Sequence, residues 1–550
     1  MDASFNVMFG LPGQGVLLRF DPLSLFFCAI LLPQIVASSL AGMRGSIGFW
    51  FVVAGMALTL LAGTPFTLIL GVGWVGAAVW CMVAQADARQ AARFLVIIVF
   101  SVLCLVPALA LSAASPAFIL VLLGASALAG LAPFYNWLPA TCAVLPDSLT
   151  AIMSGGMVKL GFYILIRFTF MTEAGAQQPW WGVVLMVIGA LSILMGALKA
   201  ALAVDLRNVL HWSSIATAGL IAVAIGIALQ AKALGHPALT GLALQAALLC
   251  ILAHALFKPL LLIGAGEVRR AVGTTSLNWL GGLMRGMPRL GGLMLVGTVG
   301  MAALPLGPAF APLFLLVHAV IGVATQGNIW AQCGCAVLLA IIGSGMGLLL
   351  LAALKMIGLG FLGRPRSLHA AAAEDAQRGP FLGMAMLGIL CLPLALAPGL
   401  VLFLCAPVIN VLAPFARTTR LTYAPLTLCL LAGLSLVAVG LAQLRWGVRG
   451  LRQTPAWNGG FGQPPVWLPF GDPHTQSSAS GFVEPIISTL GRAAGIDPAD
   501  RFLHLPLRRF YRVALLLGVR MGRLSPRLWL AVMFAALMLA LWVSALMQGS

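Results

Sequence analysis

Four ionisable cations lie inside apolar stretches of this chain, and no carboxylate accompanies them. They are Lys159 in LTAIMSGGMVKLGFYILI, His254 and Lys258 in LLCILAHALFKPLLLIGAG, and Lys355 in GSGMGLLLLAALKMIGLGF. The nine Asp and four Glu all fall in connecting segments or at their edges. A charge at bilayer depth costs ~2.5–3.5 kcal/mol on insertion scales, and chains keep one where an ion path, a partner or a cavity receives it. The cations therefore predict an ion path, and the missing acids limit which kind.

The first three cations are the strongest candidates for a proton relay. Lys159 lies eight residues before Arg167, too deep to reach the headgroups from an unbroken helix. The alternative for Lys159 is pairing with a neighbouring subunit or with buried backbone carbonyls. His254 and Lys258 are one helical turn apart on one face, and Pro259 follows, which is consistent with a local opening of the helix. Since histidine titrates near neutrality, a relay is predicted; the alternative is a satisfied polar contact between helices.

Two roles, a proton relay and a lysine that reaches the membrane interface, are open for Lys355. It lies eight residues before Gly363, so a lysine that reaches the membrane interface is the alternative to a relay. Lys199 is close to the end of its apolar run, and we expect it to reach the interface.

Other polar residues in or near the apolar runs are assigned structural roles. Asp205 and Arg207 predict a helix start with an interface charge. His211 and His318 are isolated in sequence, and we expect both to pack in the core or between helices.

The composition places these cations in an integral membrane protein. The chain has 550 residues, of which 61% are hydrophobic and 8% charged, and apolar runs of 18 residues or more recur along it. Each such run can cross a hydrocarbon layer of roughly 30 Å. Candidate spans are about 22–42, 46–63, 65–84, 94–113, 117–134, 149–170, 181–203, 206–229, 238–264, 290–305, 309–327, 332–360, 380–411 (long enough for two), 422–444 and 527–547. We predict an all-α fold with roughly 14–16 transmembrane helices.

The net charge of +18 does not indicate a nucleic-acid-binding protein. The basic residues lie in connecting segments beside apolar spans, where the positive-inside rule and anionic lipid explain them. Turns with Arg44, with Arg89 and Arg93, and with Arg207 alternate with turns that lack basic residues. This places those turns in the cytoplasm, the N-terminus outside and the chain in a bacterial inner membrane. No removable signal is evident in residues 1–20.

No motif for bond chemistry or cofactor binding is present. We find no phosphate-binding loop, dinucleotide fingerprint or nucleophile elbow. The ten cysteines are dispersed, which predicts packing roles rather than disulfides or a zinc site.

Small residues inside two spans predict helix interruptions. Ser154-Gly155-Gly156 precedes Lys159, and Gly343-Ser344-Gly345 precedes Lys355. Each cluster can open the helical hydrogen-bond ladder beside a cavity, as in transporters built from inverted repeats. The alternative is that these glycines serve close helix packing.

Several motifs resemble the antiporter-like membrane subunits of respiratory complex I and its relatives. The stretch 129–170, AGLAPFYNWLPATCAVLPDSLTAIMSGGMVKLGFYILIRFTF, is similar to the family signature. The stretches 201–220, 254–268 and 355–367 narrow the match to the membrane-bound hydrogenase branch, which includes hydrogenase-4 component B and formate hydrogenlyase subunit 3. The tail echoes that branch in Trp457-Asn458-Gly459-Gly460-Phe461-Gly462 and Ser478-Ala479-Ser480-Gly481-Phe482. Residues 20–24 resemble what usually follows a first helix in the family, so that first helix is expected to be absent.

The resemblance implies a subunit of a multi-subunit oxidoreductase complex. Redox chemistry would then occur in partner subunits that carry iron–sulfur clusters and a metal or quinone site, with no cofactor in this chain. Carried over by position, Lys159 is the first broken-helix lysine, His254 and Lys258 form the central relay, and Lys355 is the exit lysine. Partners would be other membrane and peripheral subunits, and lipid.

The chain departs from the family pattern where the family has acids. The glutamates of the family pattern fall on Gly73 and Leu313 of this chain. The acid and histidine of the family's Trp-Leu-Pro motif fall on Ala140 and Cys142, and a family lysine falls on Leu128. The acidic half of the expected pair is therefore lost, and the proton path would be partly degenerate.

The implied organisation has six parts. They are N-terminal transmembrane helices (1–114), a first antiporter-like repeat (115–229), a second repeat (230–370), C-terminal transmembrane helices (371–445), a hydrophilic and amphipathic segment (446–526) and a terminal transmembrane helix (527–550). Three hypotheses remain open: a proton-conducting role in the membrane arm, a non-pumping scaffold role in such a complex, and a role as membrane partner of a stand-alone ion or inorganic-carbon transporter.

Overall fold

The computed structural model describes residues 3–11, 14–110, 115–171 and 178–414, with short fragments at 434–435, 437–442, 445, 478–481 and 484. The expected spans 422–444 and 527–547, and the hydrophilic segment 446–526, lie outside these residues apart from the fragments. Within the described part, nine helices are long and apolar enough to cross a membrane, and four shorter helices are apolar. The predicted multi-pass helical architecture is confirmed.

The chain begins with a β-hairpin followed by four long helices. The elements are β1 (Ala3–Leu11), β2 (Gln14–Phe20), α1 (Pro22–Leu40), η1 (Met43–Gly45), α2 (Ile47–Leu60), α3 (Pro65–Ala86) and α4 (Ala88–Ala110). The antiparallel pair β1–β2 was not anticipated from the sequence. It attaches to the α2–α3 turn, where the Arg19 N–H donates to the Leu61 carbonyl and the Gly63 N–H to the Leu17 carbonyl, both at 2.8 Å.

The middle of the chain contains an interrupted helix and three long ones. The elements are α5 (Ser115–Ala129), α6 (Trp137–Val144), α7 (Asp147–Ile152), the π-helical turn η2 (Met153–Met157), α8 (Val158–Met171), α9 (Pro179–Leu202), α10 (Leu206–Ala233) and α11 (Pro237–Val272). The π turn widens the helix at Ser154-Gly155-Gly156, so the predicted opening before Lys159 is observed. Helix α11 runs unbroken through Pro259, so the opening considered there does not occur.

The last described part repeats this plan with a second interruption. The elements are α12 (Leu283–Gly286), α13 (Pro288–Met301), α14 (Phe310–Gln326), α15 (Ile329–Lys355), the π-helical turn η3 (Met356–Phe361), α16 (Leu368–Ala371), α17 (Arg378–Leu396) and α18 (Pro398–Leu412). Helix α15 is continuous at residues 343–345, so the second opening predicted there is wrong, and the π turn follows Lys355 instead.

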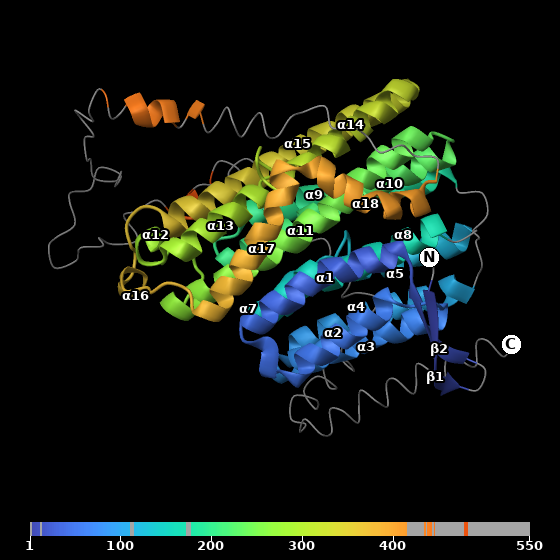
Figure 1. Ribbon diagram of the computed structural model, residues 1–550, viewed down its shortest axis with the longest axis horizontal. Coiled ribbons are helices and arrows are strands. Elements are labelled where there is room, and N and C mark those ends of the chain that lie inside the picture. The colour runs from blue at the N-terminus through green and yellow to red at the C-terminus, as the bar shows by residue number, and fades with distance from the viewer. Residues whose placement is uncertain are drawn as a thin grey trace.

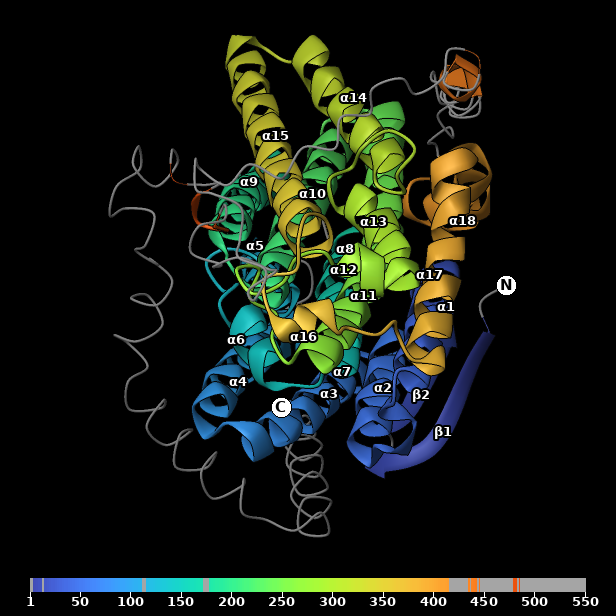
Figure 2. The same ribbon diagram turned by 90° about the vertical axis from the view of Figure 1, so that its left-hand side faces the viewer.

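The helices run side by side, with α10 and α11 at the centre of the bundle. Helix α11 packs against α10, α13, α14 and α17, and α10 packs against α9. Figure 1 shows the long helices lying parallel to one direction, with α12 and α16 at one end and the β-hairpin at the other. Figure 2 views the molecule from the side on which α12 and α16 lie, with the helices running obliquely to the line of sight.

Basic residues gather at the α12–α16 end of the bundle, which we call the basic end. Arg93 and Asn208 line one cavity there, and Arg207 and Arg269 contact the same carboxylate. The Arg270 side chain donates to the Asp375 carbonyl. Helix α1 ends beside Gly379, so η1 with its arginine also lies at this end. The predicted grouping of arginine-bearing turns on one side is thus observed.

A buried ion pair holds the opposite end of the bundle. Asp21 is 1% exposed, and its Oδ2 lies 2.6 Å from Arg167 Nη2 on α8. The other oxygen accepts the Ser24 N–H at 2.8 Å, which caps α1. Arg167 also donates to the Tyr163 hydroxyl at 2.8 Å. The pair therefore ties the start of α1 to the helix that carries Lys159.

Asp21→Asn keeps a capping oxygen but removes the charge opposite Arg167. We expect a lower free energy of unfolding, by about 3–5 kcal/mol, because one partner of a buried ion pair is left uncompensated. The melting temperature of the detergent-solubilised protein measures this loss. Glu374→Gln, which changes an exposed carboxylate in a connecting segment, is the control. Equal melting of the two variants would contradict this role of Asp21.

Candidate functional site

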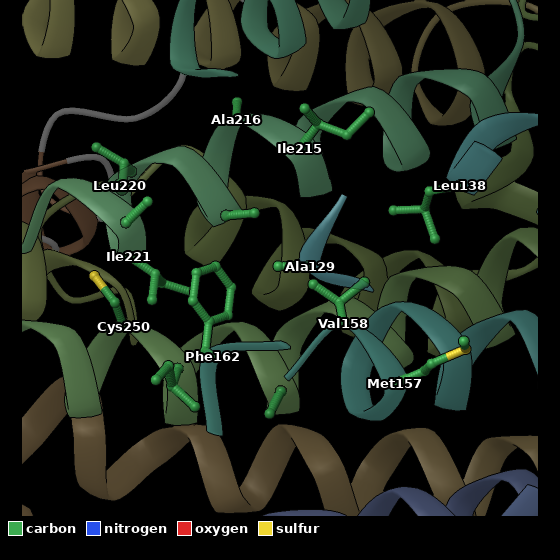
Figure 3. Packing of buried hydrophobic residues seen from close by; sticks show 14 of the residues in the cluster. Ala129, Leu138, Met157, Val158, Phe162, Ile215, Ala216, Leu220, Ile221 and Cys250 are labelled. Carbon is green, nitrogen blue, oxygen red and sulfur yellow. The ribbon is translucent and has the colours of Figure 1, made fainter. Parts of the chain in front are cut away.

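Lys159 enters the bundle centre because the π turn precedes it. The turn is fully buried, and Ser154 Oγ lies 2.9 Å from Ser214 Oγ of α10. A Cβ at Gly155 would overlap the Gln34 side chain and lie 2.6 Å from Pro259 Cγ, so glycine permits the close approach of α1 and α11. In Figure 3, Val158 and Phe162, which flank Lys159, lie among apolar side chains of α10. The local sequence thus buries the lysine between three helices.

The structure brings Lys159 and His254 together. Lys159 Nζ lies 2.7 Å from His254 Nδ1, and the two side chains are 2% and 1% exposed. Like charges at this distance in a poorly solvated interior repel strongly. Lys159 and His254 are therefore not both positively charged at the same time. The remaining ring nitrogen, Nε2, has no hydrogen-bond partner within the described ranges. The contact can therefore exchange a proton between an amine and an imidazole, residues 95 positions apart.

Lys258 extends this group toward the basic end. Its side chain is fully buried, and Nζ donates to Ser213 Oγ on α10 at 2.6 Å. Ser213 in turn donates to the Leu210 carbonyl at 2.9 Å. Among the described residues no ion pair joins Lys159, His254 or Lys258 to a carboxylate. The three predicted relay residues thus form one cationic cluster inside the protein, and none of them reaches the headgroups.

A neutral polar side chain lies beside Lys159. Gln34 on α1 is fully buried, and its Oε1 accepts no hydrogen bond. Gln34 and Lys159 line the same small cavity of about 10 Å³. A cavity near this size holds about one water where polar partners surround it. Sequence reasoning missed Gln34, because its Nε2 contact with the Gly155 carbonyl joins residues 121 positions apart.

Lys355 lies apart from the cluster. It is fully buried, and Nζ donates to the carbonyls of Ala201 and Ala203 at the C-terminal end of α9, the latter at 2.5 Å. The last carbonyls of a helix lack intrahelical partners and carry partial negative charge, so a lysine satisfies both needs. These are the contacts of a helix C-cap at the basic end. A relay role for Lys355 stays a prediction.

The positions of the missing family acids are placed by the fold. Nothing lies within 4 Å of a Cβ built on Gly73 of α3. Ala140 of α6 lines an open cavity of about 560 Å³ at the basic end, together with Arg93, Lys199 and Trp212. Lys199 Nζ stacks over the Trp212 ring, 4.5 Å from its centre. At Ala140, where the resemblance predicts an acid, this chain therefore has a hollow bordered by Arg93 and Lys199.

One carboxylate forms ion pairs with two arginines at the basic end. Asp147, at the start of α7, lies 2.7 Å from Arg207 Nε and 2.7 Å from Arg269 Nη2. Arg207 also donates to the carbonyls of Cys142 and Leu145. The pairing was not foreseen, because it joins α7, α10 and α11.

The remaining sequence predictions for polar residues have mixed outcomes. Asp205 caps α10 by accepting the N–H groups of Arg207 and Asn208, as expected of a helix start. His211 is fully buried, as predicted. His318 was predicted to be buried as well, and this is wrong: it lies exposed on α14 and contacts the Phe314 carbonyl at 2.9 Å. An isolated histidine gives no signal of which helix face meets the core.

The chain is similar to known membrane proteins in sequence and in fold. Residues 96–342 match the model of the NADH:quinone oxidoreductase/Mrp antiporter transmembrane family. Hydrogenase-4 component B of Escherichia coli K12 is 31% identical over 59% of this chain and 48% of its own length. One Na(+)/H(+) antiporter subunit of Bacillus subtilis 168 is 33% identical over 34% of this chain and 23% of its own length.

A solved structure shares the fold over nearly the whole chain. A chain of the membrane-bound sulfane sulfur reductase, an archaeal respiratory membrane complex, superposes with a TM-score of 0.76 at 20% identity. The match covers 98% of this chain and 92% of that one. By sequence, the chain spans about half the length of the hydrogenase relative that it matches.

Gly155→Ala tests the tight junction that positions Lys159. The added methyl group collides with Gln34 and Pro259, so we expect a loss of about 1–3 kcal/mol in unfolding free energy from overpacking. Gly347→Ala is the matched control, because nothing lies within 4 Å of that site on α15 and alanine favours a helix. Melting temperatures in detergent measure both. If Gly155→Ala melts at or above the control, the junction is not tight.

Proposed function

Because the chain belongs to the antiporter-like membrane proteins of the complex I and membrane-bound hydrogenase superfamily, we propose that it conducts protons as a membrane-arm subunit of a multi-subunit oxidoreductase complex. The observation that carries the proposal is the 2.7 Å contact between Lys159 Nζ and His254 Nδ1 in the centre of the bundle. Buried ionisable groups in membrane helices are costly, and they are kept where protons or ions pass.

The cluster has the chemistry of a relay. When Lys159 is an ammonium, it donates to His254 Nδ1, and transfer of that proton leaves a neutral amine and an imidazolium. Among the described residues His254 Nε2 has no hydrogen-bond partner, so its proton can pass to water. Lys258, one turn along α11, donates a hydrogen bond to the Ser213 hydroxyl, which orients its amine toward α10.

The path is partly degenerate by the family pattern. With glycine at position 73 and Gln34 beside the lysine cavity, a neutral amide and water stand in for the family carboxylate. A water that bridges Gln34 Oε1 and Lys159 Nζ would stabilise the ammonium less than a charge does. Proton occupancy of the pair would then respond to neighbouring cations more than to a local acid.

The same family relationship is the basis for the partner subunits that we propose. Partners would be other membrane subunits and peripheral subunits that carry iron–sulfur clusters and a metal or quinone site. The basic end would face the cytoplasm of a bacterial inner membrane, since arginines gather there. Apolar side chains such as Leu32, Phe403 and Leu404 are exposed on α1 and α18, and lipid or another membrane protein of the complex would cover them.

Two observations favour other functions. The missing acids and the capping role of the Lys355 contacts favour a non-pumping scaffold subunit. The similarity to an Na(+)/H(+) antiporter protein favours a membrane partner of a stand-alone ion or inorganic-carbon transporter. Genes for iron–sulfur proteins and for a hydrogenase-type large subunit beside this gene would support the complex; an isolated gene would favour the transporter.

Lys159→Met tests conduction directly. The full assembly is reconstituted in vesicles, a potassium gradient with valinomycin imposes a potential, and an entrapped pH dye reports proton flux. We expect a loss of roughly tenfold or more, because methionine fills the site without carrying a proton and general acid–base groups contribute factors of about 10²–10⁴ in other systems.

Two lysine variants calibrate this measurement. Lys232→Met, at the far end of α10 where the lysine donates to the Phe170 carbonyl, should keep wild-type flux. Lys355→Met tests the exit role predicted by position. Wild-type flux in both Lys159→Met and Lys355→Met would reject conduction through these residues and leave the scaffold function.

A further inference from the structure

We propose that His211 on α10 carries protons between Lys258 and the cluster of Asp147, Arg207 and Arg269 at the basic end. This inference rests on the proposed conduction and names the route by which the central relay reaches the cytoplasmic surface. It concerns a histidine that sequence reasoning assigned to core packing.

His211 is an anomaly as a packing residue. Its side chain is fully buried, and neither Nδ1 nor Nε2 has a hydrogen-bond partner in the part of the chain that the structure describes. A neutral imidazole has one donor and one acceptor, and leaving both unpaired in the interior is costly. Leucine or phenylalanine would fill the volume without that cost. The two open ring nitrogens therefore fit a group whose partners are a proton and water.

Cations lie near this histidine on two helices. Arg207 is four residues earlier on α10, one turn away on the same face. Lys258 of α11 donates to the Ser213 hydroxyl, two residues after His211, at 2.6 Å. The Lys258 ammonium therefore meets α10 about 3 Å along the axis from His211, at 1.5 Å per residue, and on a different face of the helix.

Polar groups continue from His211 along α10 toward the surface at the basic end. Arg207 lies about 6 Å further along α10, at 1.5 Å per residue, and its Nε is 2.7 Å from Asp147 Oδ1. The second oxygen of Asp147 is 2.7 Å from Arg269, whose side chain is 43% exposed. A solvent-accessible cation and a carboxylate therefore end the series that begins at Lys159.

The transfer step is a proton exchange without redox change. The Lys258 ammonium gives a proton through water to one ring nitrogen of His211, which forms a new N–H bond and leaves a neutral amine. The opposite ring nitrogen then releases its own proton to water or to the Asp147 carboxylate. Histidine can relay in this way because its two nitrogens exchange donor and acceptor roles.

The test uses His211→Gln and His211→Phe in the intact complex. Glutamine keeps polarity and phenylalanine keeps volume, and neither titrates. Proton flux under an imposed potential is measured in vesicles as for Lys159→Met, and melting temperature is recorded for each variant. His318→Gln, at an exposed histidine on α14, is the matched control.

We expect tenfold or greater loss of flux in both His211 variants, with wild-type flux in His318→Gln and a melting temperature in His211→Phe at or above wild type. Wild-type flux in either folded His211 variant, with Lys159→Met impaired, overturns the His211 route and leaves the proposed function intact. Wild-type flux in the His211 variants and in Lys159→Met alike overturns both. A His211→Gln variant that loses flux while His211→Phe conducts normally also overturns the route.

Discussion

Everything in the bundle centre depends on cationic side chains held in a poorly solvated interior without a counter-charge. The contact of Lys159 with His254 is short and buried, so the two residues must share a proton rather than carry one each. A carboxylate in this place would stabilise a second positive charge and hold the proton more tightly. The absence of an ion pair for these residues in the described part therefore favours a lightly held proton, which is what transfer requires.

The helix interruptions make this arrangement possible. The π turn at Met153–Met157 and the glycine contact at Gly155 bring α1 and α11 close to α8. Without that approach, Lys159 and His254 could not meet. The second π turn follows Lys355 directly and lets its side chain reach the end of α9. A π turn thus accompanies the Lys159–His254 contact at one place and a helix cap at the other, so similar sequence patterns lead to different lysine environments.

The sequence predicts the helices well and the contacts poorly, for physical reasons. Hydrophobic length alone locates nearly every described span, and it divides residues 380–411 into α17 and α18 as expected. Depth alone indicates that Lys159 and Lys258 are buried. Their partners could not be derived, because Ser213, Gln34 and Asp147 depend on which helices neighbour one another. Glycine clusters are ambiguous for the same reason: Gly155 faces a crowded junction, whereas Gly343 and Gly347 face open space.

The charged residues at the two ends of the bundle differ from those at its centre, which bears on the direction of the proposed proton movement. Asp21 with Arg167 and Asp147 with Arg207 and Arg269 place carboxylates at the two ends of the bundle, while the centre has lysines and histidines. A proton bound at the centre is repelled by each neighbouring cation, and the carboxylate at each end is already paired with arginine. In the proposed conduction, this repulsion would keep the proton lightly held at the centre. The field across the membrane, or a partner that changes the charge near Asp147 or Asp21, would then decide which end receives it.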